Sequence, residues 1–141
     1  GRLGNQMFQY AALIGFATHS NQRWGIPKRN SEEIEIGGLG YKERFVLNDM
    51  FDLNYETEIT PQSNFMENGT LVSLPENTNI HGYFQNSDYF DHCKDIVRKE
   101  FTFKDTIKDK VQHFVDSLNV DDLVSVPVRR GDYVNLSDVV V

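Results

Sequence analysis

Two adjacent arginines beside a glycine and an aspartate form the strongest chemical feature of the sequence. The four residues are Arg129, Arg130, Gly131 and Asp132. They follow Leu123–Val128, a mostly β-branched apolar run that is typical of a strand buried in a parallel sheet. Paired guanidinium groups at the end of such a strand suit a diphosphate, because each is always charged and presents a planar fork of donors. The alternative is an ordinary solvent-exposed Arg–Asp ion pair.

A glycine-containing turn, Gly-Arg-Leu-Gly, opens the chain and leads into a predicted helix. Asn5 is a good N-cap for a helix from Gln6 to about His19, rich in alanine and other small residues. Because apolar residues cover most of its surface, we expect this helix to be buried on several sides. Helix N-termini attract anions, but the glycine spacing matches neither a P-loop nor a dinucleotide fingerprint. A tight turn without a ligand is therefore the alternative.

A third candidate lies where a predicted strand, Asn79–Gln85, reaches its end. On a strand, Tyr83 and Gln85 would share one face and could contact a sugar. A core strand with a glycine bulge at Gly82 is the competing interpretation.

The order of the predicted elements indicates an α/β fold. A short strand is expected at Arg23–Ile26, and a helix capped by Asn86 or Ser87 should run to about Phe101. A second helix, capped by Asp105 or Thr106, precedes the apolar strand Leu123–Val128. We expect residues 28–79 to be irregular or inserted, with short pieces at Phe45–Phe51 and Thr70–Leu74.

Composition excludes several classes of protein. The 141 residues fit one ordinary domain, and 14 Lys and Arg against 21 Asp and Glu leave a net charge of −7, which argues against nucleic-acid partners. Cys93 is the single cysteine, so no intrachain disulfide and no cysteine-based zinc site can form. The four histidines show no metal-ligand spacing, and no Asp-x-Asp pair is present. The composition favours a cytoplasmic globular protein that binds no metal.

Taken together, three segments resemble the α-1,2-fucosyltransferases, glycosyltransferase family 11. Residues 1–11 resemble the opening motif of that family. Residues 82–85, followed by Tyr89-Phe90 and later by aromatics at 101 and 103, resemble its middle block. Residues 124–134 resemble its His-x-Arg-Arg-Gly-Asp-Tyr motif. Three ordered motifs are far more specific than any one of them.

The resemblance implies a truncated chain, the Rossmann-like half of a GT-B glycosyltransferase. Residues 1–120 would form the N-terminal, acceptor-side domain with the insertion at 28–79. Residues 121–141 would supply the first strand and loop of the donor-nucleotide domain. The implied reaction is an inverting, metal-independent transfer of L-fucose from GDP-fucose to the 2-hydroxyl of a terminal galactose on a glycan. The chain by itself is expected to be inactive, and peripheral association with a membrane is left open.

The resemblance also assigns site residues. The catalytic residues would be Arg129, Arg130 and Asp132, where the arginines contact the diphosphate or fucose and Asp132 is a candidate base. The substrate-binding residues would be Asn5, Gln6, Tyr83, Gln85, Gly131 and Tyr133.

One position departs from the family pattern. Pro127 stands where the family has histidine, so the chain lacks an imidazole on the strand face that carries Arg129. A non-catalytic relative that binds a glycan or nucleotide is therefore the competing function. A flavodoxin-like binding module would explain the strand–helix pattern but not the three ordered motifs.

Overall fold

The structure is a computed structural model that describes residues 3–26, 34–36, 41–43, 45–118, 120, 122 and 124–126. The chain divides into two compact units, Gly1–Lys108 and Asp109–Val141.

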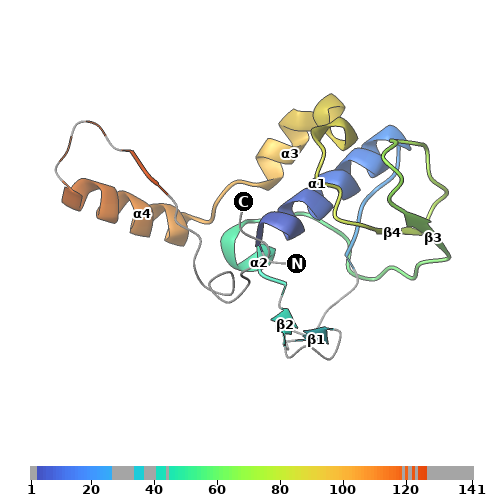
Figure 1. Ribbon diagram of the computed structural model, residues 1–141, viewed down its shortest axis with the longest axis horizontal. Coiled ribbons are helices and arrows are strands. Elements are labelled where there is room, and N and C mark those ends of the chain that lie inside the picture. Colours follow the sequence, from blue (N-terminus) through green and yellow to red (C-terminus); the bar gives the residue numbers. More distant parts are fainter. Residues whose placement is uncertain are drawn as a thin grey trace, which may run out of the picture. The chain divides into compact units, whose positions relative to one another are not determined.

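Helix α1, Leu3–His19, is the central element of the first unit (Figure 1). It contacts α2 (Leu47–Met50), α3 (Lys94–Glu100) and two 3-10 turns, η1 (Ser87–Tyr89) and η2 (Asp91–Cys93). Its buried side chains occur all along its length, so the predicted burial on several sides is confirmed. The predicted N-cap is wrong, because the helix begins at Leu3 and Asn5 therefore lies in its first turn.

Two small two-stranded sheets complete the first unit. Strands β1 (Ile34–Ile36) and β2 (Tyr41–Glu43) pair antiparallel, whereas β3 (Ser63–Met66) and β4 (Thr78–His81) pair parallel. These strands and α2 show that residues 28–79 are not irregular throughout. The short piece expected at Phe45–Phe51 is confirmed as α2, but Thr70–Leu74 forms no helix or strand.

Two predicted strands are shorter than the sequence indicated. At Arg23–Ile26 the structure has only an isolated parallel bridge between Gly25 and Glu56. Strand β4 ends at His81 instead of continuing to Gln85. The cause is local backbone geometry, because Gly82 has φ of 155° and Phe84 has φ of 51°, which an extended strand does not allow.

The predicted helix from Asn86 to Phe101 is interrupted. The Asn86 side chain does cap the first turn by accepting the amide of Asp88. Phe90, with φ of −140° and ψ of 2°, then separates the two 3-10 turns, and regular helix begins only at Lys94. A single turn of 3-10 helix cannot be told from α-helix by apolar spacing alone.

Helix α4, Asp105–Leu118, confirms the second predicted helix, but its predicted cap is wrong because Asp105 and Thr106 are both helical. The strand expected at Leu123–Val128 is not found in its described part, since residues 124–126 are in no strand. Val124 and Val126 are 85% and 76% exposed, so the buried sheet position that this run favoured is not formed by the described residues. The described chain is therefore mixed α/β, with one small parallel sheet.

Two apolar clusters pack against α1. One joins α1 to α2 and α3 through Tyr10, Ala11, Ile14, Leu47, Phe51, Cys93 and Val97. The other joins α1 to η1 and the segment after β4 through Ala12, Phe16, Phe84 and Tyr89. The two clusters hold α1 rigidly, which matters because its first turns carry predicted site residues.

A buried polar network crosses the first cluster. The Tyr10 hydroxyl donates to Glu100 Oε2 at 2.7 Å and accepts from Trp24 Nε1 at 3.2 Å. Asn54 donates its amide to the same Glu100 oxygen at 2.8 Å. Burial, together with the bond to Glu100, raises the pKa of Tyr10 far above its usual value. Tyr10 is therefore a permanent donor to a carboxylate that is only 8% exposed.

Replacing Tyr10 with phenylalanine is expected to lower the free energy of unfolding by about 1–3 kcal/mol. The buried Glu100 oxygen would then keep the Asn54 amide but lose its hydroxyl donor. The denaturation midpoint at unchanged slope measures the effect. Tyr55→Phe is the matched control, because the Tyr55 hydroxyl accepts from the exposed side chain of Asn48. Equal shifts for both variants would contradict a structural role for the Tyr10–Glu100 bond.

Candidate functional site

The first turns of α1 meet the carboxyl end of β4. Asn5 Oδ1 accepts a hydrogen bond from Gln85 Nε2 at 2.8 Å, and Gln9 Nε2 donates to the Gly82 carbonyl at 2.8 Å. Asn5 and Gln85 were predicted as site residues from motifs 80 residues apart, and the structure brings their side chains into direct contact. Both remain at least partly exposed, so the pair can be reached from solvent.

Glu67 holds the turn that follows β4. Its Oε2 atom accepts the backbone amides of Tyr83 at 2.8 Å and Phe84 at 3.0 Å. Gly82 is required there, because a Cβ on it would lie 2.4 Å from the Glu67 Cβ. Glu67 belongs to the region in which the sequence offered no motif, so no sequence pattern indicated its role.

The other two described candidates lie in different surroundings. Tyr83 is 60% exposed and lies beyond the end of β4, so its relation to Gln85 is that of two loop residues and not of one strand face. Gln6 is 8% exposed, and its Oε1 atom accepts the amide of Val46 at 2.9 Å. The bond from Gln6 ties α1 to the segment that leads into α2.

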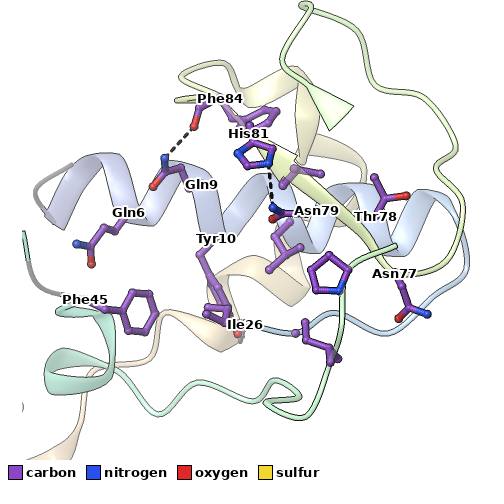
Figure 2. A pocket seen from close by; sticks show the side chains of 16 residues that line it. Gln6, Gln9, Tyr10, Ile26, Phe45, Asn77, Thr78, Asn79, His81 and Phe84 are labelled. Atoms are coloured by element: carbon purple, nitrogen blue, oxygen red, sulfur yellow. Dashed lines mark hydrogen bonds between the residues drawn. The ribbon is translucent and has the colours of Figure 1, made fainter. Parts of the chain in front are cut away.

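A cavity of about 440 Å³ lies beside the N-terminal half of α1 (Figure 2). One wall consists of residues 77–82, and Gly25 and Ile26 line it as well. Helix α1 contributes Gln6, Gln9, Tyr10 and Leu13, and the remaining lining residues are Phe45, Ile59, Pro61 and Phe84. Of the predicted substrate-binding residues that the structure describes, only Gln6 contributes to this lining, so the Asn5–Gln85 pair lies outside the cavity.

A second polar group lies on the open face of the β3–β4 sheet. His81 Nε2 is 2.9 Å from Asn79 Nδ2 and 3.0 Å from Asn64 Oδ1, and none of the three was a predicted site residue. Across the described residues, no group of three or more His, Cys, Asp or Glu side chains could hold a metal ion. No helix in the described part is both long and apolar enough to span a bilayer.

The arginine motif belongs to the part of the chain that the structure does not describe. Arg129, Arg130, Gly131, Asp132 and Tyr133 all lie outside the described residues. So does Pro127, the position that departs from the family pattern.

Comparison with protein-family models gives the class of the chain. All 141 residues match a glycosyltransferase model, described as glycosyl transferase family 11. The chain belongs to this family, as the three motifs indicated.

Curated relatives point in the same direction. The chain is similar to galactoside alpha-(1,2)-fucosyltransferase 2 of Hylobates lar and of Mus musculus, each 28% identical over 96% of this chain and 40% of the relative. It is also similar to galactoside alpha-(1,2)-fucosyltransferase 1 of Rattus norvegicus, 26% identical over 96% of this chain and 38% of the relative. The chain thus spans about two fifths of the length of these relatives. No solved structure matches it.

Proposed function

We propose that the protein containing this chain transfers L-fucose from GDP-fucose to the 2-hydroxyl of a terminal galactose on a glycan. Membership of glycosyl transferase family 11 and the names of the curated relatives support a fucosyl transfer to a galactoside. In this proposal the enzyme has a GT-B fold, and the present chain supplies its N-terminal half and the start of the donor domain. Its location would be cytoplasmic, with or without peripheral membrane association.

The proposed chemistry is a single inverting displacement. The 2-hydroxyl oxygen of galactose bonds to the anomeric carbon of fucose while the bond from that carbon to the diphosphate breaks, so that GDP leaves. Arg129 and Arg130 would neutralise the developing charge on the diphosphate without a metal, as preorganised donors do. Asp132 is the candidate that accepts the proton of the attacking hydroxyl.

The observation that carries the proposal is the Asn5–Gln85 hydrogen bond of 2.8 Å. It joins the first family motif to the second, and it lies at the carboxyl end of β4. Ligands of open α/β sheets bind at the carboxyl ends of strands. Two amide side chains there offer donors and acceptors of the kind that orient sugar hydroxyls. We propose that this pair and Tyr83 hold the acceptor sugar or the fucose.

A transfer assay with the full-length protein is expected to yield a fucosylated product from GDP-fucose and a galactose-terminated disaccharide. Mass spectrometry detects the product, and NMR identifies a linkage to the galactose 2-position. The same disaccharide with 2-deoxygalactose is the matched control and should give none, because the attacking oxygen is absent.

Two further outcomes are expected in the same assay. A chelator should leave the rate of transfer unchanged. Residues 1–141 alone should be inactive, since most of the donor domain is missing.

A binder without catalysis is the second candidate, and Pro127 is the observation that favours it. Calorimetric binding of GDP or of the disaccharide by the full-length protein, with no product in the assay, would decide for this candidate. Transfer to another hydroxyl of galactose would retain the family assignment but overturn the proposed specificity.

A further inference from the structure

The cavity beside α1 runs along two backbone edges and not across a sheet face. Its lining includes six consecutive residues, 77–82, as well as the consecutive pair Gly25 and Ile26. Side chains alternate between the two faces of a strand, so a cavity above one face would contact every second residue. A cavity that contacts every residue must border the edge of the strand.

The backbone of β4 turns half of its polar groups toward this cavity. The carbonyls of Asn77 and His81 accept amides from the β3 side, at 2.8 Å each. Because backbone groups alternate along a strand, those of Thr78 and Ile80 point in the opposite direction. The described residues provide no strand on that edge, since β4 pairs with β3 alone.

The opposite edge of the cavity is formed by the segment of Gly25 and Ile26, which also turns backbone groups toward the cavity. Ile26 donates its amide to the Glu56 carbonyl at 2.8 Å, and Glu56 donates its own to the Trp24 carbonyl at 3.1 Å. Trp24 and Ile26 therefore use their backbone groups on the Glu56 side, which leaves the amide and carbonyl of Gly25 directed toward the cavity. Two parallel pairings, β3 with β4 and Gly25 with Glu56, thus flank one vacant position, which no strand of the described residues occupies.

Helix α1 lies along this vacant position in a fixed direction. Gln6, Gln9, Tyr10 and Leu13 recur at helical spacing and line the cavity. The N-terminal turns of α1 lie at the carboxyl end of β4, as the bond from Gln9 to Gly82 shows. The other end of α1 lies before the start of β4, where Ser20 Oγ accepts the amide of Leu74 at 2.9 Å.

We propose that the cavity is the position of an extended strand formed by the residues that directly precede Gly1 in the longer protein. This strand would run parallel to β4, pair with Ile80 on one side and Gly25 on the other, and turn into α1 at Leu3. A strand that ends where α1 begins must share the direction of β4, because α1 starts at the carboxyl end of β4. The unit strand–α1–segment 24–26 is then an ordinary β-α-β crossover.

Chemistry favours a strand over a small ligand. Both cavity edges present amides and carbonyls at backbone spacing, and a strand satisfies both rows at once. The chain spans about two fifths of the length of its relatives, so their length leaves room for a further strand. We expect the segment to be rich in Val and Ile, as buried strands of parallel sheets are. The completed sheet would place the Asn5–Gln85 contact at its carboxyl edge.

Amide hydrogen exchange at single-residue resolution tests the proposal on the protein with its own preceding residues. In that protein the amides of Gly25, Thr78 and Ile80 should exchange at least about 100-fold more slowly than in residues 1–141. The amide of Asn79 faces β3 and should differ little between the two. If residues 1–141 alone do not fold, the longer protein still decides, since Thr78 and Ile80 should be protected as strongly as Asn79.

Three results would overturn the proposal. They are fast exchange of the Thr78 and Ile80 amides in the longer protein, protection of these amides only after GDP or a galactoside is added, and a natural protein that begins at Gly1.

A variant pair gives an independent measurement in the longer protein. Ile80→Pro removes an amide that only the new strand would use, so it should melt about 5 °C or more below Ile80→Ala. Equal melting temperatures of the two variants would mean that the cavity-facing edge of β4 is unpaired, which would also overturn the proposal. Neither test depends on fucosyl transfer.

Discussion

If the proposed function holds, replacing Arg130 with lysine in the full-length protein is expected to lower kcat by a factor of about 30 to 1,000, a loss of about 2–4 kcal/mol of transition-state stabilisation. Lysine keeps the positive charge but loses the planar fork that can donate two parallel hydrogen bonds to a diphosphate. Initial rates at saturating GDP-fucose and acceptor measure the effect, and thermal melting reports whether the fold is retained.

Arg23→Lys is the matched control for this substitution. The Arg23 side chain is 86% exposed and forms an ion pair with Glu56. Exposed pairs of this kind contribute little, so kcat should stay unchanged. An unchanged kcat for Arg130→Lys as well would remove Arg130 from the donor site. A loss of kcat that follows the loss of folded protein would make it a structural residue.

Replacing Gly15 with alanine is expected to destabilise the protein by about 3 kcal/mol. A Cβ at Gly15 would lie 1.9 Å from the Tyr89 carbonyl oxygen and 2.9 Å from its carbonyl carbon. Both are backbone atoms, so relief requires η1 to move away from α1. Tyr89 resists that movement, because it is 1% exposed and its hydroxyl accepts the amide of Gly69. The free energy of unfolding from denaturant titration measures the cost.

Gly4→Ala is the control on the same helix. Apart from its chain neighbours and its own helix backbone, no described atom lies within 4 Å of a Cβ built there, so only helix propensity acts and stability should rise by up to about 1 kcal/mol. If Gly15→Ala proves as mild as Gly4→Ala, the close approach of α1 and η1 is not a constraint on the fold.

Local sequence was sufficient to predict an element where that element is long and its apolar residues recur regularly. The spacing of Ile107, Val111, Phe114 and Leu118 predicted α4, but the cap proposed at Asp105 or Thr106 was wrong, because both residues lie inside the helix. The small and apolar residues of α1 predicted both the helix and its burial. Asn86 was correctly expected to cap the element after β4, since an Asx side chain satisfies an adjacent amide without help from the rest of the fold. The three motifs together also indicated the family.

Tertiary structure decided the features that depend on distant partners. Apolar residues at 83 and 84 continue a strand pattern, yet β4 stops at His81 because Gly82 and Phe84 adopt positive φ. The Glu67 carboxylate stabilises that turn by accepting two amides from 16 and 17 residues away, a contact that no local pattern reveals.

For the candidate site too, sequence identified the residues, whereas the fold determined their contact. Sequence named Asn5 and Gln85 separately, one as a helix cap and the other as a strand residue, and both local roles were wrong. Only the folded chain brings the two side chains within 2.8 Å of each other. The physical reason is that residue type and spacing determine what a side chain can donate or accept. The packing of α1 against the end of β4 determines which partner it meets.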